Sequence, residues 1–350
     1  MSFNFNRLPV RVEHQANQLA NKQNVIQFFA PDVTKKNPIN YNKFAFYNHD
    51  IKNNIKQQEA IKHIVSATAH PSPYLIFGPP GTGKTVTVVE AILQVRKLKP
   101  EQRILVSAPS NSAADEITKR LIKHVSKVDL FRYVARNYSY DLIDVAVKPY
   151  TNCKDEFYYP DSKELLKYHI VVTTLVTAFR LVNGGIPPNH FSYVFIDESG
   201  QATETETLIP IVGILTNILT PGAINGQIVL AGDPQQLGPV IHSQRANDIG
   251  YGISMLERLM THCKPYKKVK GSYNSNVLTK LVNSYRSHPA ILEQPNKLFY
   301  DGELIPPKNQ ELANIAVGWD ELPNKRFSVI FHSVLGKDER EENSPSFFNV

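Results

Sequence analysis

An eight-residue glycine-rich segment carries the strongest chemical signal in the chain. It matches the pattern G-x-x-x-x-G-K-[ST] and consists of Gly78-Pro79-Pro80-Gly81-Thr82-Gly83-Lys84-Thr85. The apolar run YLIF precedes it and the helix-like run VTVVEAILQV follows it, which is the context that a phosphate-binding loop requires. The glycines let backbone N–H groups turn inward as an anion nest, and the helix N-terminus adds its positive end. We predict that Lys84 reaches the β- and γ-phosphates of a nucleoside triphosphate and that Thr85 ligates Mg²⁺.

Two acidic residues that follow another apolar run complete this predicted site. Asp197 and Glu198 end the run YVFI. The carboxyl end of a rigid strand facing the phosphate loop is where a metal-holding carboxylate belongs. We predict that Asp197 holds Mg²⁺ through water and that Glu198 polarises the attacking water as a general base.

A weaker polar cluster follows the apolar run QIVLAG. It consists of Gly232-Asp233-Pro234-Gln235-Gln236. Taken alone, this cluster is typical of a turn. A polar group at the end of a buried strand is also placed to sense the γ-phosphate, so both interpretations stay open at this point.

Short apolar runs of strand length alternate with helix-like segments from Ile51 onward. The clearest runs are YLIF, RILVSA, HIVVTT, YVFID and QIVLAG. Their continuous apolar character indicates strands covered on both faces. The alternation with helices indicates βαβ units with right-handed crossovers. The sequence therefore predicts an α/β fold in which a parallel sheet has helices on both faces.

Changes of composition predict how the chain is divided. Residues 1–50 are rich in Asn, Gln and Lys and indicate an irregular connector, and residues 51–270 indicate the ATPase domain. Within that domain, the aromatic stretch 125–165 of mixed charge indicates an insertion or a long surface excursion. The Lys- and Gly-rich stretch 264–275 favours a linker. The strand-like VLTKLV after it is expected to begin a partial second α/β domain over residues 275–350.

Bulk composition excludes several classes of protein. The chain has 350 residues, 42% hydrophobic and 20% charged, which is typical of a soluble globular protein. Its net charge of +7 is as compatible with an ordinary basic surface as with a polyanionic partner. Two cysteines, Cys153 and Cys263, exclude a disulfide scaffold and a four-cysteine zinc site. With no apolar run near the roughly 20 residues that span a bilayer and no signal-peptide core, we expect a cytoplasmic or nuclear protein.

Seven blocks, in this order along the chain, resemble the superfamily 1 helicases of the up-frameshift-like group. The blocks are NNIKQQEAI, GPPGTGKT, SAPSNSAADEI, VVTTLVTAFRL, FIDESGQA, AGDPQQLGPV and NSYRSHPAIL. Three more, NFNRLPVRVEHQA, LFYDGEL and GKDEREENSPSFFN, resemble the branch that contains the Armitage and Moloney-leukemia-virus-ten helicases. This resemblance covers nearly the whole chain.

The resemblance implies two RecA-like domains with ATP bound in the cleft between them. It implies that Gln57 reads adenine, since an amide pairs with N6 and N7 together, and that Tyr285 stacks on the base. It also implies that Gln236 couples the γ-phosphate to RNA and that Arg286 reaches the γ-phosphate from the second domain. Such an arginine stabilises transition-state charge and contributes on the order of 10³–10⁵ in rate. ATP and Mg²⁺ are the expected ligands.

The same blocks imply contacts with single-stranded RNA. Hydroxyl and amide groups in loops at strand ends bind phosphates and 2′-hydroxyls without reading the base sequence. The residues implied are Ser110, Asn111, Thr173, Thr174, Pro239 and Val240. The branch further implies 5′-to-3′ movement, RNA-silencing proteins as partners, and a cytoplasmic location that extends to RNA granules.

One departure from the family pattern affects the expected activity. The group normally continues past SPSFFN with a glutamine-glycine block and a second arginine finger, so we expect a chain truncated within the second RecA-like domain and an incomplete motor. The leading hypothesis is an ATP-dependent RNA helicase. A DNA helicase of the same superfamily and a non-catalytic ATP- or RNA-binding fragment stay open as alternatives. A GTPase is disfavoured because no N-K-x-D block occurs.

Overall fold

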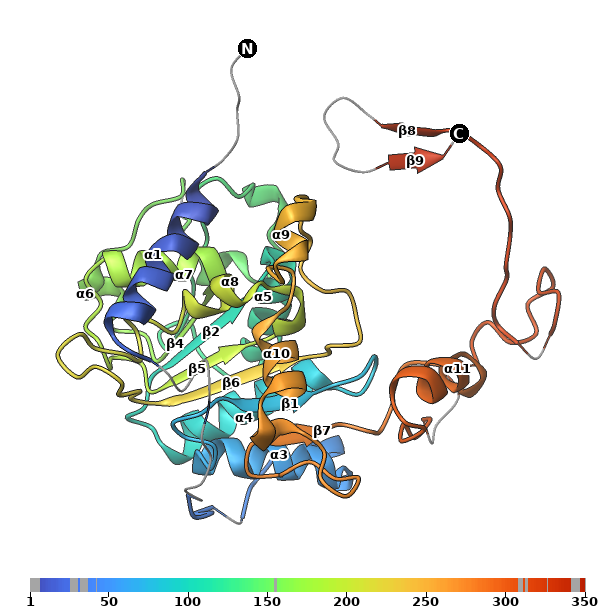
Figure 1. Cartoon of the computed structure of the whole chain (residues 1–350), viewed down its shortest axis with the longest axis horizontal. Helices are drawn as coiled ribbons and strands as arrows, with labels where there is room; N and C mark the ends of the chain where they lie inside the picture. Colours follow the sequence, from blue (N-terminus) through green and yellow to red (C-terminus); the bar gives the residue numbers. More distant parts are fainter. Residues whose placement is uncertain are drawn as a thin grey trace. The chain divides into compact units, whose positions relative to one another are not determined.

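The chain divides into two compact units, residues 1–284 and 285–350 (Figure 1). The computed structural model describes residues 7–25, 31, 37–41, 43–153, 156–307, 311, 314–325, 327–340 and 347–349. None of the helices within these ranges is long and apolar enough to cross a membrane. Each unit is described separately below.

Unit 1 is built on a sheet of seven parallel strands in the order β3-β4-β2-β5-β6-β1-β7. Every strand residue except Thr174 is buried, as expected for a parallel sheet that is covered on both faces. The strands are β1 (Tyr74–Phe77), β2 (Ile104–Ala108), β3 (Leu130–Arg132), β4 (Ile170–Thr174), β5 (Tyr193–Ile196), β6 (Gln227–Gly232) and β7 (Leu278–Lys280).

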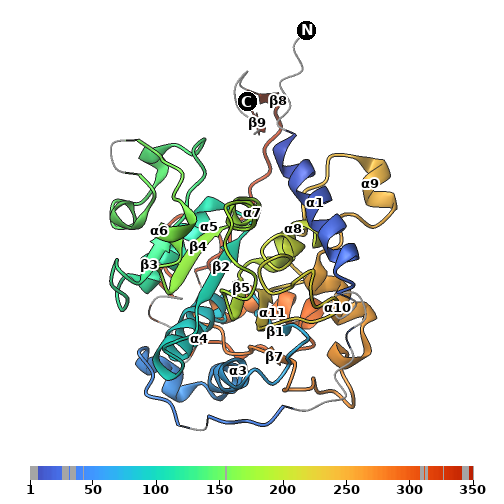
Figure 2. The same ribbon diagram turned by 90° about the vertical axis from the view of Figure 1, so that its left-hand side faces the viewer.

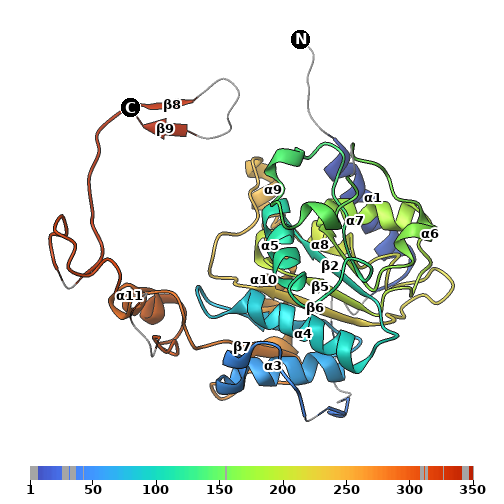
Figure 3. The same ribbon diagram turned by 180° about the vertical axis from the view of Figure 1, so that it is seen from behind.

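Helices cover both faces of this sheet (Figures 2 and 3). The α-helices of unit 1 are α1 (Leu8–Lys22), α3 (Ile55–Ser66), α4 (Lys84–Leu98), α5 (Asn111–Leu121), α6 (Ser162–Leu165), α7 (Leu175–Asn183), α8 (Glu204–Leu208), α9 (Gln244–Asp248) and α10 (Met255–His262). Short 3-10 turns are η1 (His49–Asn53), η2 (Tyr140–Leu142), η3 (Lys148–Tyr150), η4 (Ser199–Gln201) and η5 (Lys264–Tyr266).

The direction in which the chain crosses the sheet decides which face each helix covers. From β1 the chain moves toward the β3 edge through α4 and α5, and from β4 it returns toward β7 through α7, α8 and α10. Because both runs make right-handed crossovers, their helices lie on opposite faces, with α3 beside α4 and α1 against α7 and α8. The predicted α/β fold, a RecA-like parallel sheet with helices on both faces, is confirmed for unit 1.

The first 50 residues, expected to be an irregular connector, contain the helix α1, which packs against other helices of unit 1. Val12, Ala16 and Ala20 of α1 are buried at a spacing of four residues and form one stripe against α7 and α8. Glu13 is buried beside this stripe, and its carboxylate accepts hydrogen bonds from the hydroxyls of Thr205 and Tyr251. The polar composition concealed the helix because its buried apolar residues are confined to this narrow stripe.

The stretch predicted to be an insertion contributes a strand to the sheet. Its strand β3 pairs in parallel with β4, with Leu130 opposite Ile170. The rest of the stretch has a small core of its own, in which Val134, Ile143 and Val147 are buried against Tyr138 and Phe157. The prediction of a surface excursion therefore applies only to the part after β3.

The segment VLTKLV, predicted to open a second domain, belongs to the sheet of unit 1 instead. It forms β7, which pairs in parallel with β1, with Leu75 opposite Leu278. The Tyr74 hydroxyl lies 2.7 Å from the Thr279 hydroxyl, and the Thr68 hydroxyl donates to the Asn276 carbonyl at 2.7 Å. Without β7, β1 would be the edge strand of the sheet and would expose unpaired backbone groups. Unit 1 therefore extends to Ser284.

Unit 2 contains one helix and one hairpin among its described residues. They are α11 (Pro289–Phe299) and the antiparallel pair β8 (Asp338–Arg340) and β9 (Phe347–Asn349). Leu292, Tyr300 and Leu304 are buried. The Asn296 side chain accepts from the Leu304 N–H at 2.9 Å and donates to its carbonyl at 3.1 Å, which ties the turn after α11 back to the helix.

We expect Ala16→Asp to lower the free energy of unfolding by about 3 kcal/mol, because it places a carboxylate without a partner under α1. The neighbouring Gln15→Asp is the matched control, since residue 15 is exposed on the same helix. Urea unfolding followed by circular dichroism measures both. Equal stability of the two variants would contradict the packing of α1 described above.

Candidate functional site

The loop between β1 and α4 is held in one conformation by its glycines. Gly81 and Gly83 have φ of 73° and 79°, a region that favours glycine. A Cβ on Gly78 would lie 2.8 Å from the Lys84 Cβ, so a larger residue would displace that lysine. The Gly78 N–H donates to the Gly232 carbonyl at 3.0 Å, which joins the start of the loop to the end of β6. The backbone is thus shaped as an anion nest at the N-terminus of α4.

The phosphate loop follows β1, and the acidic pair predicted from the sequence follows β5. The side chains of the two segments are in contact, although β6 lies between the two strands. The Lys84 ammonium lies 3.1 Å from a carboxylate oxygen of Glu198. The Thr85 hydroxyl donates to Asp197 at 2.9 Å. These four side chains come from segments more than 100 residues apart, and the sheet brings them together as predicted.

The two acidic residues have different surroundings. Asp197 is buried, and burial raises the pKa of its carboxyl group while the nearby Lys84 charge lowers it. The side chain of Glu198 is 30% exposed, and its backbone adopts the left-handed region with φ of 53°. A non-glycine residue in that region is strained, and such strain is concentrated at functional sites. Glu198 is therefore the member of the pair that solvent can reach.

The donor set fits Mg²⁺ together with a phosphate ligand. In the described part of the chain no group of three or more His, Cys, Asp or Glu side chains could hold a metal ion by itself. The site instead offers one hydroxyl, of Thr85, and one carboxylate, of Asp197. Mg²⁺ is commonly bound by one or two carboxylates, substrate phosphates and water. Bound there, it would neutralise phosphate charge.

Gln57, predicted to read adenine, lies beside the phosphate loop. Its side chain is buried, and its amide nitrogen donates to the Gly83 carbonyl at 3.3 Å and to the Thr87 hydroxyl at 3.0 Å. Gln57 therefore ties α3 to the loop in this structure. Its contact with adenine stays a prediction.

The turn after β6 is packed against the turn after β5. A Cβ on Gly200 would lie 2.9 Å from the Asp233 carbonyl oxygen, so the two backbones are in contact there. Asp233 is buried, and one of its carboxylate oxygens accepts from the Gln236 amide at 2.7 Å. Gln236 is thus held near the acidic pair from the neighbouring strand. Tyr285 and Arg286 are the first residues of unit 2, and their roles stay predictions.

The predicted RNA residues that follow β2 and end β4 lie on neighbouring strands. Thr174 is opposite Ala108 in the register of β2 and β4, and Ser110 and Asn111 follow β2 directly. The Ser110 hydroxyl accepts from the Ala113 N–H at 3.2 Å and caps α5. Pro239 and Val240 lie in the loop after β6, which β5 separates from β2. Val240 is 81% exposed.

Thr173 does not fit its predicted role. Its side chain is fully buried in β4, and its hydroxyl donates to the Tyr133 carbonyl at 3.0 Å. The period-two alternation of a strand explains the correction, since consecutive side chains point to opposite faces. The Thr173 side chain therefore stabilises the β3–β4 edge and is closed to RNA.

Sequence reasoning missed a buried arginine next to the RNA segment. Arg132 is fully buried and pairs with Asp115 at 2.7 Å, and it also donates to the Asn111 side chain at 2.9 Å. The available signal was an arginine inside the apolar run LFRYV, where a charge requires a partner.

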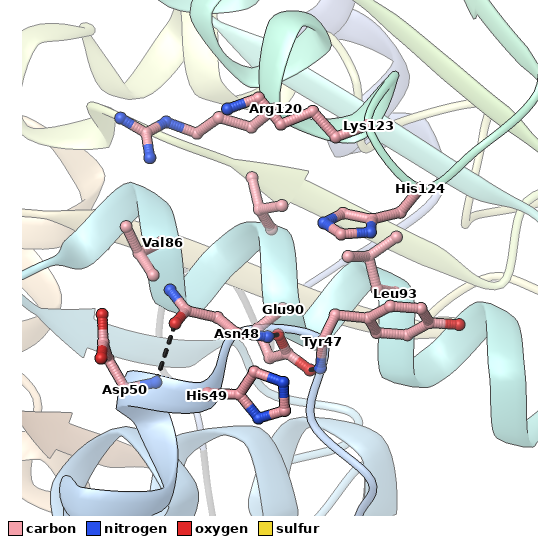
Figure 4. A pocket seen from close by; sticks show the side chains of 11 residues that line it. Tyr47, Asn48, His49, Asp50, Val86, Glu90, Leu93, Arg120, Lys123 and His124 are labelled. Carbon is pink, nitrogen blue, oxygen red and sulfur yellow. Dashed lines mark hydrogen bonds between the residues drawn. The ribbon is translucent and has the colours of Figure 1, made fainter.

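A cavity of about 420 Å³ lies apart from these residues, on the outer side of α4. Figure 4 shows Arg120, Lys123 and His124 along one side of it and His49 and Asp50 along the other. No residue of the phosphate loop and no predicted RNA residue lines it.

Comparison with known proteins places this geometry in a family. A family model described as AAA domain matches residues 52–154 and 148–244, and a second model of the same description matches residues 251–350. The chain belongs to the AAA-domain helicases of the Mov10 group. The predicted resemblance to up-frameshift-like superfamily 1 helicases is thereby confirmed.

Three relatives illustrate this membership. The chain is 46% identical over its whole length to the helicase named MOV-10 of Gallus gallus, of which it covers 37%. It is 44% identical to RNA helicase Mov10l1 of Homo sapiens, with 88% of the chain and 25% of that protein covered. It is 33% identical over its whole length to the RNA helicase armi of Drosophila melanogaster, of which it covers 33%. The chain thus spans between 25% and 37% of the length of these relatives.

We expect Asp197→Asn to raise the free energy of unfolding of the nucleotide-free chain by about 1 kcal/mol at neutral pH. Burial disfavours the charged carboxylate, and an amide removes that charge. The raised pKa means that the folded chain binds this proton more tightly than the unfolded chain. The native protein therefore gains stability as the pH falls from above its folded-state pKa toward the ordinary value of 3.8, and the advantage of the variant shrinks.

Urea unfolding at a series of pH values measures this difference. Glu198→Gln is the matched control, and we expect little change because its partly exposed ion pair with Lys84 contributes little to stability. A variant at position 197 that is less stable than the native chain at neutral pH would contradict the description of Asp197 as a costly buried charge.

Proposed function

We propose that this chain is part of the motor of an ATP-dependent RNA helicase. The proposal rests on two contacts beside the phosphate loop, that of Lys84 with Glu198 and that of Thr85 with Asp197. The glycines of this loop shape its backbone as an anion nest. This arrangement provides phosphate charge neutralisation, a Mg²⁺ ligand and a general base within one set of contacts. Relatives that cover the chain are named RNA helicases, which supports RNA as the nucleic acid.

Each residue has a separate task in the proposed hydrolysis. Backbone N–H groups of the loop and Lys84 would hold the triphosphate, and Thr85 and Asp197 would hold Mg²⁺. Glu198 accepts a proton from the water that attacks the γ-phosphate, and ADP leaves. When phosphates occupy the nest, Lys84 exchanges its contact with Glu198 for the phosphate oxygens, which releases the carboxylate to act as a base. Contacts of Arg286 with the γ-phosphate and of Tyr285 with the base stay predictions from the family resemblance.

The sheet supports coupling between hydrolysis and RNA. The residues assigned to the phosphates follow β1, β5 and β6. Of the predicted RNA residues, Ser110 and Asn111 follow β2, and Thr174 ends β4. In parallel strands all these positions lie at one edge of the sheet. Gln236 follows β6, which lies between β5 and β1, and its amide donates to Asp233, so it lies among the residues assigned to the phosphates. We propose 5′-to-3′ movement on single-stranded RNA, cytoplasmic location and RNA-silencing partners for the whole protein.

We expect Glu198→Gln to lower ATP turnover by about 100-fold or more while ATP binding is retained, because a general base contributes that order of magnitude and does not bind the phosphates. Phosphate release with and without single-stranded RNA measures turnover, and a fluorescent ATP analogue measures binding. Glu101→Gln, at an exposed residue in the turn that follows α4, is the control and should keep full turnover. Unchanged turnover in the Glu198 variant would remove the assigned base.

RNA and DNA of one base sequence distinguish the two helicase hypotheses. We expect tighter binding of RNA, because contacts to 2′-hydroxyls are absent from DNA. For RNA, the logarithm of the binding constant should fall with the logarithm of salt concentration at a slope of about −0.7 for each phosphate contact. Equal affinity for both nucleic acids would favour a DNA helicase of the same superfamily, and ATP binding without turnover would favour a non-catalytic module.

A further inference from the structure

Arg132 occupies an unusual position at the end of the edge strand β3. Its side chain is fully buried although it carries a charge that burial strongly disfavours. Such a residue persists only where nearly all of its N–H groups have partners. The sheet places it opposite Val172 of β4, at the edge of the sheet where the predicted RNA segments lie.

The guanidinium makes separate contacts with three residues. Its Nε donates to Asp115 of α5 at 2.7 Å, and one terminal nitrogen donates to the Tyr133 carbonyl at 2.8 Å. The other terminal nitrogen donates to the side-chain oxygen of Asn111 at 2.9 Å. Asp115 and Asn111 are four residues apart in α5 and therefore face Arg132 from the same side of the helix.

The contact with Asn111 decides how its amide is oriented. A side-chain amide has one oxygen, which accepts, and one NH₂ group, which donates. Because the Asn111 oxygen faces the buried guanidinium, the NH₂ group is the end directed away from it. Asn111 is partly exposed and is the first residue of α5. Its orientation therefore offers a donor, the group that a phosphate oxygen or a 2′-hydroxyl accepts from.

The same guanidinium connects β4 to this arrangement. The Tyr133 carbonyl that accepts from Arg132 also accepts from the buried Thr173 hydroxyl at 3.0 Å. Thr173 precedes Thr174, which ends β4 beside the loop that contains Ser110 and Asn111. The loop after β2 and the end of β4 are thus joined through one buried charge. This also gives the Thr173 side chain a role, although it does not reach RNA.

We propose that Arg132 is a positioning residue for single-stranded RNA: it holds the Asn111 amide with its donor toward the RNA and keeps the β2 and β4 segments in register for one strand. The proposal rests on the proposed function, since Asn111 is assigned an RNA contact there. Lysine cannot replace this arginine, because one ammonium group lacks the planar fork that reaches Asp115, Tyr133 and Asn111 together.

A double-mutant cycle with Arg132→Lys and Asn111→Ala tests whether Arg132 acts through Asn111. Fluorescence anisotropy of a labelled oligouridine measures the RNA affinity of the full chain and each variant. We expect each single variant to bind about 5-fold more weakly, in the range of the net contribution of one lost hydrogen bond. The double variant should bind no more weakly than Asn111→Ala. Arg136→Lys, an exposed arginine in the next turn, should bind as the native chain does.

The outcomes separate three cases. Failure of the native chain to bind oligouridine would overturn the RNA part of the proposed function. Native affinity in Asn111→Ala would show that Asn111 does not contact RNA and would overturn the inference. An Arg132→Lys effect of the same size in both backgrounds would show a general structural role and would also overturn it. Binding of the ATP analogue to the phosphate loop, in a separate part of the sheet, reports that each variant is folded.

A second variant tests the donor without touching the buried charge. Asn111→Asp keeps an oxygen for Arg132 and is expected to keep the native melting temperature, but it offers RNA a carboxylate in place of the NH₂ group. We expect it to bind oligouridine more weakly than Asn111→Ala does, because the carboxylate repels phosphate. If Asn111→Asp bound oligouridine as tightly as the native chain, the Asn111 NH₂ group would not donate to RNA. This result would be decisive even if Arg132→Lys did not fold.

Discussion

A sheet that is buried on both faces requires strands joined by helical crossovers, and this constraint makes the strands parallel. Parallel strands end at one edge, so every loop with a chemical role in unit 1 meets its neighbours there. The order β4-β2-β5-β6-β1 then separates two tasks along that edge. The residues assigned to the phosphates follow β1 and β5, and the predicted RNA residues Ser110, Asn111 and Thr174 lie at the ends of β2 and β4. β6, which Asp233 and Gln236 follow, lies between the two phosphate strands β5 and β1.

Asp197 and Arg132 are both buried at this edge of the sheet, and burial disfavours the charge of each. Their surroundings differ in how far they compensate for the lost contact with water. Asp197 is held where burial raises its pKa, so the nucleotide-free chain carries an unfavourable carboxylate that a cation would stabilise. Arg132 is fully buried but makes a short ion pair with Asp115 and further hydrogen bonds. A charge whose contacts are completed within the protein orders its surroundings, whereas a charge that burial leaves disfavoured is ready for a ligand.

The sequence predicted well those features that depend on neighbouring residues. The apolar runs that form β1, β2, β4, β5 and β6 were recognised because a strand buried on both faces is apolar at consecutive positions. It predicted α1 and β7 poorly. In α1 the buried apolar residues form only a narrow stripe, and β7 was assigned to another domain because a basic, glycine-containing stretch precedes it. Thr173 was misplaced because its motif does not show which face of β4 it occupies.

The sequence alone determined the phosphate loop, the acidic pair and the α/β alternation, since these depend on local backbone conformation and on residues adjacent in the chain. Their arrangement was decided only by the tertiary structure. The contacts of Lys84 with Glu198 and of Arg132 with Asn111 join segments from different strands, and the pairing of β7 with β1 joins residues about 200 positions apart. No local pattern specifies such partners, because they are selected by the burial of the whole sheet and by the need of each buried charge for a partner.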